Sequence, residues 1–273
     1  MSTSLSLAFP SVVARLRAAG CVFAEDEAQL LISAAGTPAE LDDMVTRRVR
    51  GLPLEHVIGW AEFCGLRLAV DPGVFVPRPR TEFLVRQAAA LARPGAVVVD
   101  LCCGSGAMGA ALAAAAAGPV ELHAVDVDPA AVRCARRNLA PVCGRTVGTV
   151  YEGDLYAALP AALRGRVDVL LASPPYVPTG AIGLLPPEAR EHEPQVALDG
   201  GADGLDVVRR VVAGADAWLA PGGHLLVETS ESQAEETAEA VARAGLTARL
   251  THDDELDATA VIGTRPGSRG AHP

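Results

Sequence analysis

The chain has no run of apolar residues that is both long enough and free enough of charge to cross a membrane. Its most apolar stretch, residues 107–118, is mostly alanine and is shorter than the roughly 20 residues that a bilayer requires, so it suits a buried helix better. The first residues lack a basic region before their apolar part and an obvious cleavage site, so no signal peptide is predicted. The expected location is therefore the cytoplasm.

Patterns that hold a metal ion or attract nucleic acid are missing as well. The 6 cysteines form no Cys-x-x-C pair and no Cys/His spacing that could assemble a tetrahedral metal site, so buried, reduced thiols are the simpler interpretation. No Lys/Arg-rich run occurs and the formal net charge is -10, which weighs against broad attraction to nucleic acid, although a local basic patch stays open. An acidic enzyme with a compact substrate fits better.

What is present is enough apolar sequence for a large core. The chain has 273 residues, of which 50% are hydrophobic and 21% charged, which allows one full domain and a small extra one. Amphipathic segments at 9–19, 26–35 and 38–49 predict a helical N-terminal domain, residues 1–50, and Gly-Thr-Pro before the last of them supplies a helix stop and a capping threonine. Scattered Gly and Pro among alternating apolar residues predict a linker or β-hairpin at 51–79.

From residue 80 to 264 the pattern alternates between helix and strand. Strands separated by helices imply parallel pairing with both sheet faces covered, and therefore an α/β fold. The predicted strands are 96–101, 120–126, 146–151, 167–172 and 224–229, followed by an antiparallel edge pair, 246–251 and 258–263. Residues 265–273 are expected to be a flexible tail.

A glycine-rich turn joins the first of these strands to the next helix. Gly104, Gly106 and Gly109 match G-x-G-x-x-G, which alone suggests a dinucleotide site. Glycines at such a turn let a ligand lie against the backbone, and the helix start offers free N–H groups. Asp126, about twenty residues further on at the end of the second strand, can bind both hydroxyls of a ribose, whether in NAD or in S-adenosylmethionine.

The carboxylate just before the turn favours one of these two ligands. Asp100 would crowd a pyrophosphate but could attract the ammonium group of a methionine moiety, directly or through water, which favours the cationic sulfonium cofactor. Asp154, after the third strand, is a candidate for the adenine amino group. The alternative is that Asp100 and Asp154 only cap turns, which is less favoured because three carboxylates follow three successive strands.

Ser173-Pro174-Pro175-Tyr176 ends the fourth strand and is expected to face the same crevice. Two prolines fix φ and donate no N–H, so the carbonyls of Ser173 and Pro174 stay available as acceptors for an NH2 group. The Ser173 hydroxyl and one of these carbonyls could direct a nitrogen at a cofactor methyl group while Tyr176 stacks on the flat amide. The turn is interpreted as a clamp for an amine or amide in methyl transfer, and the alternative is a structural proline turn.

Together these segments resemble the HemK/PrmC family, which methylates the glutamine side-chain amide in the Gly-Gly-Gln tip of peptide-chain release factors. The resemblance rests on the Ser-Pro-Pro-Tyr turn, on residues 47–85 with Pro-Arg-Pro-Arg-Thr-Glu, and on residues 191–212 with Glu-Pro and Leu-Asp-Gly-Gly-Ala-Asp-Gly-Leu. It covers nearly the whole chain. It implies a class I S-adenosylmethionine-dependent methyltransferase with a Rossmann-like, seven-stranded mixed sheet, residues 80–264, and an N-terminal domain that docks a protein substrate.

The resemblance also assigns roles to residues. Residues 173–176 would surround the target glutamine, and Ser173 would contact the cofactor as well. Including Asp100 from the argument above, the expected cofactor contacts are Asp100, Cys102, Gly104, Ser105, Gly106, Asp126, Asp154, Leu155 and Ser173. A release factor is the expected partner, and neither a metal nor a membrane is expected to bind.

Three departures from the family pattern bear on the acceptor. Ser173 stands where the family usually has Asn, Cys102 replaces a glycine, and Arg80 replaces an acidic residue. A Ser-Pro-Pro-Tyr turn also occurs in cytosine-amino DNA methyltransferases, so a nucleic-acid base or a small molecule stays open as the acceptor. An NAD-dependent oxidoreductase is a further alternative, but the Ser-Pro-Pro-Tyr turn has no role in hydride transfer. A non-catalytic binding module is the last alternative, and it would be favoured if the protein showed no turnover.

Overall fold

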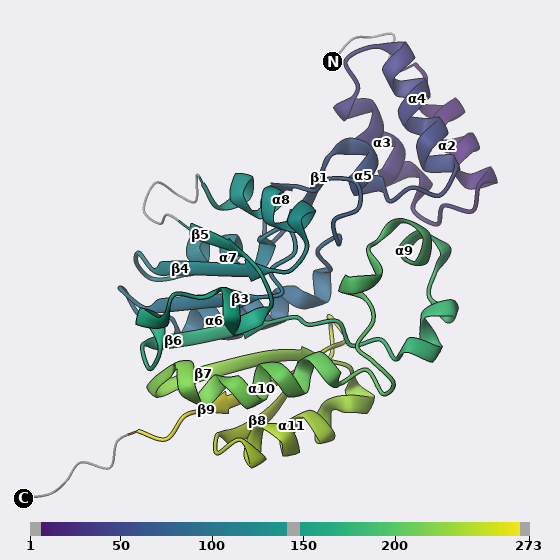
Figure 1. Ribbon diagram of the computed structural model, residues 1–273. Coiled ribbons are helices and arrows are strands. Elements are labelled where there is room, and N and C mark those ends of the chain that lie inside the picture. Colours follow the sequence, from purple (N-terminus) through teal and green to yellow (C-terminus); the bar gives the residue numbers. More distant parts are fainter. Residues whose placement is uncertain (1–6, 141–147, 268–273) are drawn as a thin grey trace, which may run out of the picture.

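The structure, a computed structural model, describes residues 7–140 and 148–267 and centres on a seven-stranded mixed sheet (Figure 1). In their order across the sheet the strands are β5 (Gly148–Glu152), β4 (Glu121–Asp126), β3 (Val97–Leu101), β6 (Val167–Ala172), β7 (Leu219–Thr229), β9 (Ala258–Thr264) and β8 (Thr247–Asp253). The five strands from β5 to β7 are parallel, and β9 and β8 complete the sheet with antiparallel pairing. The predicted α/β fold with an antiparallel edge pair is confirmed; the predicted strand start at Thr146 lies outside the described residues.

Helices cover both faces of this sheet because its central strands are apolar on both sides. On β3, Val98 packs with one layer of helices, whereas Val97, Val99 and Leu101 pack with the other, as the period of two along a strand requires. The first layer contains α6 (Glu82–Leu91), α7 (Ala107–Ala115) and α8 (Pro129–Leu139). The second contains α10 (Asp206–Trp218) and α11 (Ala234–Arg243) (Figure 1).

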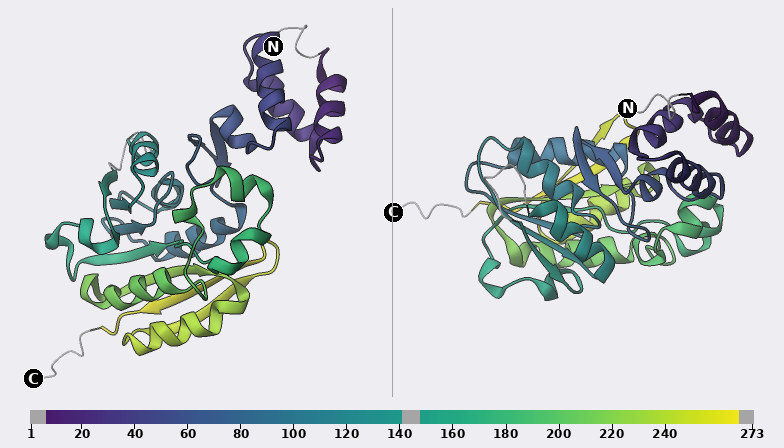
Figure 2. Two further views of the ribbon diagram at one scale, coloured as in Figure 1. Left: turned by 45° about the vertical axis from the view of Figure 1, so that its right-hand side comes forward. Right: turned by 90° about the horizontal axis from the view of Figure 1, so that it is seen from above.

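A separate group of helices precedes the sheet and projects from one end of it (Figure 2). It consists of α2 (Phe9–Ala18), α3 (Ala24–Ala34), α4 (Pro38–Val49) and the short α5 (Leu54–Ile58). Their own core contains Leu16, Leu31 and Val45, all fully buried. Thr37 caps α4 as predicted, since its hydroxyl accepts a hydrogen bond from the Glu40 N–H.

A small hairpin connects these helices to the sheet. It pairs β1 (Trp60–Phe63) with β2 (Leu66–Ala69), and the 3-10 helix η1 (Pro79–Thr81) then leads into α6. Asn138 of α8 fixes the hairpin to the sheet: its Oδ1 accepts from the Ala69 N–H at 2.8 Å, and its Nδ2 donates to the Ser105 carbonyl at 2.9 Å. One side chain therefore links the hairpin, α8 and the glycine-rich turn.

The segment between β6 and α10 runs over the end of the sheet and returns past the N-terminal helices. It contains α9 (Pro187–His192), which lies between those helices and the sheet (Figure 1). Arg48 of α4 forms ion pairs with Glu27 of α3 at 2.6 Å and with Glu188 of α9 at 3.3 Å. Further 3-10 helices are η3 (Leu155–Ala158), η4 (Ala161–Leu163), η5 (Thr179–Leu184), η6 (Gln195–Ala197) and η7 (Glu231–Gln233).

Membrane-spanning helices and metal-binding clusters are both absent from the described residues. None of the helices within 7–140 and 148–267 is long and apolar enough to pass through a membrane. Over the same residues, no three His, Cys, Asp or Glu side chains gather in a way that could hold a metal ion. The thiols of Cys21, Cys64, Cys102, Cys103 and Cys134 are free, and Cys143 lies outside the described residues.

Candidate active site

The order of the strands places the candidate site at the ends of β3 and β6. From β3 the chain proceeds outward to β4 and β5, and then returns to form β6 on the other side of β3. Such a reversal leaves a crevice at the carboxyl ends of the two central strands. Leu101 pairs with Ala172, so the residues that follow them, Cys102 and Ser173, lie side by side. Both line a cavity of about 820 Å³.

The glycine-rich turn forms one side of this cavity. Cys102 has a φ of 56°, the left-handed conformation that a glycine would adopt more easily, so cysteine tolerates it here at a cost. Asp126, at the end of β4, holds the turn from the side: one carboxylate oxygen accepts from the Gly104 N–H at 2.8 Å and the other from the Asp128 N–H at 2.9 Å. Burial raises the pKa of Asp126, and these two backbone donors oppose that rise. Cys102, Gly104 and Asp126 all line the cavity.

Three of the predicted cofactor contacts lie behind the cavity wall. Asp100 is fully buried because it faces α7, where its Oδ2 accepts from the Gly109 N–H at 2.9 Å. Ser105 is also buried, and Gly106 packs against Ala135 of α8, which a Cβ would approach to 3.1 Å. None of these three is among the residues that line the cavity, so their contact with a cofactor stays a prediction.

The surroundings of Asp100 nevertheless disfavour the charged form of its carboxyl group. Its Oδ1 has no hydrogen-bond partner in the described part of the chain. Burial raises the pKa of Asp100 to about 7, with Asp126 adding to the rise and the Gly109 N–H opposing it. The wall beneath the glycine-rich turn therefore holds a carboxyl group that titrates near neutral pH.

The end of β5 contributes the far side of the cavity. Asp154 and Leu155 both line it, and Leu155 has a φ of 47°, a second non-glycine residue in the left-handed conformation. The exposed Asp154 carboxylate forms an ion pair with Arg210 of α10. Backbone strain of this kind is concentrated at ligand sites in proteins.

Opposite the glycine-rich turn stand the residues of the Ser-Pro-Pro-Tyr turn, and all four line the cavity. The loop 198–206 supports this turn from behind: the Val177 N–H donates to the Leu198 carbonyl at 3.1 Å, and the Gly200 N–H donates to the Val177 carbonyl at 2.9 Å. Gln233 adds a further link, because its Nε2 donates to the Tyr176 carbonyl at 3.0 Å and to the Asp203 carbonyl at 2.9 Å.

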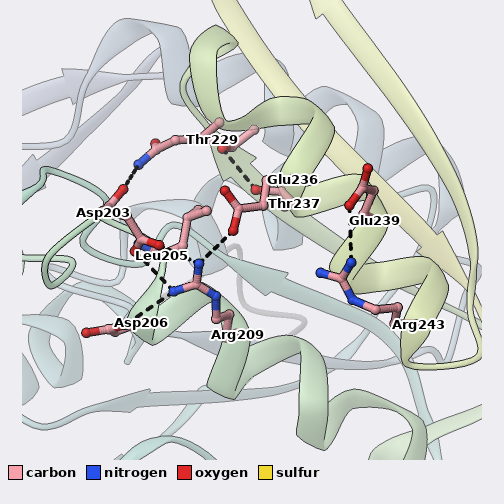
Figure 3. A network of polar contacts seen from close by, with 10 residues as sticks. Asp203, Leu205, Asp206, Arg209, Thr229, Glu236, Thr237, Glu239 and Arg243 are labelled. Atoms are coloured by element: carbon pink, nitrogen blue, oxygen red, sulfur yellow. Dashed lines mark hydrogen bonds and ion pairs between the residues drawn. The ribbon is translucent and has the colours of Figure 1, made fainter.

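The supporting loop is itself fixed by an ion-pair network (Figure 3). Arg209 of α10 reaches Asp203 of the loop, Asp206 at the start of α10 and Glu236 of α11. The hydrogen bonds from Arg209 lower the pKa of Asp203 to about 2, so this carboxylate is ionised at neutral pH. The loop thereby connects the turn to both helices of one layer.

Close backbone approach explains the glycines of this loop. At Gly200 a Cβ would lie 2.5 Å from the Gly204 carbonyl oxygen and 2.7 Å from the Pro175 carbonyl oxygen. At Gly204, which has a φ of 82°, a Cβ would lie 2.3 Å from the Tyr176 carbonyl oxygen. Gly200 and Gly204 are therefore required for the loop to pack against the turn.

Sequence reasoning missed a carboxylate in the cavity wall. Glu228, near the end of β7, is 5% exposed and lines the cavity beside Ser173. Arg80, noted above only as a departure from a pattern, lies with its Nε 3.8 Å from Glu228 Oε1. The signal was present in His-Leu-Leu-Val-Glu-Thr, because a lone charged residue closes an apolar strand there as Asp126 does in β4.

A second missed residue, Glu193, links the α9 segment to the residues before α6. Its carboxylate is buried, accepts from the Val76 N–H at 3.1 Å and pairs with Arg78. Burial raises the pKa of Glu193, while Arg78 and the Val76 N–H oppose the rise. Glu193, the first residue of the Glu-Pro pair seen in the sequence, therefore links two segments that are more than 100 residues apart in the chain.

Comparisons with known proteins agree with this geometry. The family model of the methyltransferase small domain matches residues 65–183. Two relatives are called release factor glutamine methyltransferase. The one from Geobacter sulfurreducens is 38% identical over 82% of this chain and 77% of its own length, and the one from Mycolicibacterium smegmatis is 38% identical over 89% and 90%.

A third relative has a different acceptor in its name. The 4-amino-L-phenylalanine/4-methylamino-L-phenylalanine methyltransferase of Streptomyces pristinaespiralis is 39% identical over 73% of this chain and 68% of its own length. Among solved structures, a methyltransferase from Pyrococcus furiosus aligns with a TM-score of 0.55 and 18% identity over 74% of this chain and 90% of that chain, which supports the fold alone.

Proposed function

The chain belongs to the family of release factor glutamine methyltransferases, and on this premise we propose that it transfers a methyl group from S-adenosylmethionine to a protein glutamine. The acceptor is the side-chain amide nitrogen in the Gly-Gly-Gln motif of a peptide-chain release factor. The observation that carries the proposal is the adjacency of Cys102 and Ser173, which follow paired strands and line one cavity. A methyl donor and a nitrogen acceptor can therefore meet there without a movement of the fold.

The residues on the β3, β4 and β5 side fit the donor. Gly104 leaves the backbone open, since a Cβ there would meet no protein atom within 4 Å, and Asp126 presents a carboxylate that can also accept from ribose hydroxyls. Asp154 and Leu155 are proposed to border the adenine. Acidic groups on this side favour a cationic ligand. When bound, S-adenosylmethionine supplies an electrophilic methyl group on its sulfonium.

The residues on the β6 side are proposed to hold the acceptor nitrogen. Ser173 and Pro174 can accept hydrogen bonds from the amide NH2, through the serine hydroxyl and the proline carbonyl, while Tyr176 covers the flat group. In the transition state the nitrogen becomes pyramidal and partly positive. Fixed acceptors stabilise that nitrogen more than the planar amide, which is how they accelerate the reaction.

The rim of the cavity suits a protein substrate. Val196 lines the cavity and is 51% exposed, and Leu184, next to the cavity-lining Leu185, is 86% exposed. Both belong to the segment between β6 and α10. We propose that this rim and the helices of residues 1–50 dock the release factor, that nucleic acid is not a substrate, and that the protein acts in the cytoplasm. We also propose that the chain is divided into a docking domain, residues 1–50, a linker, residues 51–79, and a methyltransferase domain, residues 80–264.

The test is methylation of an intact release factor by the purified protein. With S-adenosylmethionine present, the peptide that contains Gly-Gly-Gln should gain the mass of one methyl group, and a release factor with that glutamine replaced by alanine should gain none. The S173A variant should bind S-adenosylmethionine with nearly unchanged affinity but lose turnover. Intact release factor that gains no methyl group in the presence of active-site-titrated enzyme would contradict the substrate assignment.

A second acceptor class belongs in the same assay. Ser173 stands where the family usually has asparagine, and a relative at 39% identity is named for an aromatic amine. Because the serine side chain is shorter than that of asparagine, it leaves more room for the nitrogen of an arylamine. If 4-amino-L-phenylalanine is methylated with a kcat/KM above that of the release factor, the acceptor is a small-molecule amine, and the reaction type is retained.

A further inference from the structure

The buried carboxylate of Glu228 has no role in the function proposed so far. It belongs to β7, where its neighbour Val227 pairs with Ala172 of β6, so Glu228 lies beside Ser173. On its other side, its partner in β9 is Ala260, which offers no polar side chain. Glu228 Oε2 is buried and has no hydrogen-bond partner among the residues that the structure describes. A carboxylate left in this condition costs free energy, which suggests a use.

The groups around Glu228 favour its ionised form in part. Burial is the largest influence and raises the pKa of Glu228, whereas the hydroxyls of Thr81 and Ser173 and the guanidinium groups of Arg80 and Arg78 oppose that rise. Tyr176 lines the same cavity, and burial first and the charge of Glu228 second raise the pKa of its phenol. Glu228 is therefore a base stronger than an exposed glutamate, held within reach of the acceptor site.

We propose that Glu228 is a positioning residue that orients the Ser173 hydroxyl and, through it, receives the proton that the acceptor nitrogen loses. This inference rests on the proposed function. A serine hydroxyl has one hydrogen, and when that hydrogen points to Glu228 the oxygen lone pairs face the cavity. Ser173 is then an acceptor toward the amide NH2, whereas a freely rotating hydroxyl would serve as donor or acceptor. Glu228 thus fixes the polarity of the site.

The step balances in atoms and charge. The C–N bond forms as the C–S bond breaks, and the electron pair of the C–S bond stays on sulfur. The nitrogen, now carrying the methyl group, loses one N–H proton to Ser173 Oγ. The Ser173 hydroxyl proton moves at the same time to Glu228, which becomes neutral and later releases the proton to solvent. No further reactant is required.

The kinetic test compares E228Q, E228D and the matched control T229V. Thr229 is the next residue of β7, and its hydroxyl pairs with that of Thr237 at 3.3 Å (Figure 3). Neither of these two threonines is among the residues that line the cavity. For the wild type, kcat should rise with pH as Glu228 ionises and then level off. E228Q should lower kcat about 100-fold and abolish this rise, with the Kd for S-adenosylmethionine within threefold of wild type. E228D should restore part of kcat together with the rise, and T229V should match the wild type.

An E228Q variant whose kcat stays within threefold of wild type, or which keeps the rise with pH, would overturn the inference. A merely structural role predicts a different result: a lowered melting temperature in E228Q without a changed pH profile. The melting temperatures of E228Q and T229V therefore accompany the kinetics.

A second measurement needs no acceptor and separates this inference from the proposed function. The carboxyl C=O band of protonated Glu228, assigned by subtracting the E228Q infrared spectrum, can be titrated in the ligand-free protein. S173A removes a donor to the ionised form, so the band should persist to higher pH than in wild type, while T229V should not move it. An unchanged titration in S173A would refute the Ser173–Glu228 contact. If no acceptor is methylated but this shift is observed, the proposed function fails and the contact stands.

Discussion

The contact between Gly204 and the Ser-Pro-Pro-Tyr turn gives the sharpest test of how the fold holds the acceptor site. In G204A the new Cβ would lie 2.3 Å from the Tyr176 carbonyl oxygen and 2.4 Å from Gln233 Nε2, so the loop or the turn must move. The φ of 82° adds a strain of about 1–2 kcal/mol for a residue with a side chain. With the clash included, the free energy of unfolding should fall by about 2–4 kcal/mol.

The functional effect should be selective. A displacement of the acceptor by about 1 Å reduces the rate of a positioned reaction about 100-fold, so kcat for methyl transfer should fall by that factor. Binding of S-adenosylmethionine, measured by calorimetry, should stay within threefold of wild type because the donor side belongs to other strands.

The control is G245A, in the turn between α11 and β8. Gly245 has a φ of 86°, yet a Cβ there would meet nothing within 4 Å. G245A therefore carries the backbone strain without the clash and should lose only about 1–2 kcal/mol, with unchanged kcat. If urea denaturation gave equal losses for both variants and G204A kept full activity, the proposed support of the turn by the loop would be wrong.

Three further changes test other parts of the site. Because burial raises the pKa of Asp100 from 3.8 to about 7, ionised Asp100 destabilises the fold, and the free energy of unfolding should fall as pH rises from about 4 to about 7. D100N should remove about 2.7 kcal/mol of this dependence between pH 5 and pH 8, measured as the difference between variant and wild type in urea denaturation at these two pH values without ligand. D126N can accept from only one of the two backbone N–H groups that Asp126 holds, so the Kd for S-adenosylmethionine should rise at least about tenfold by calorimetry, with a smaller change in kcat. R48M leaves two carboxylates without their partner and should lower the free energy of unfolding by about 3 kcal/mol at pH 8, and an unchanged melting temperature would show that the ion pairs do not hold the N-terminal helices to α9.

Most of the sheet could be predicted because buried strands appear in the sequence as short apolar runs, separated by segments with the period of a helix. The exceptions are instructive. The strand predicted to begin at His224 begins at Leu219, since Pro221-Gly222-Gly223 reads as a turn while Leu219 still pairs with Val167 across a register shift. Helices α5 and α9 were not predicted; they have 5 and 6 residues, too few to show a helical period.

The site was harder to predict than the fold because a sequence does not show which face of a strand a side chain takes. Asp100 and Asp126 both lie near the carboxyl ends of apolar strands, yet the structure buries Asp100 against α7 and leaves Asp126 in the cavity wall. Glu228 follows the same pattern as Asp126, but its neighbour Ser173 is 55 residues away in the chain. Only the pairing of β6 with β7 brings them together.

The pairing of Leu101 with Ala172 has a consequence for how such enzymes diversify. Adjacent strands in a sheet lie about 4.8 Å apart, and backbone hydrogen bonds set that spacing whatever the side chains are. Donor and recipient are thus kept in alignment by the peptide scaffold itself. Side chains at the end of β6 can therefore change, and new molecules can be accommodated there, while the geometry of the transfer stays the same.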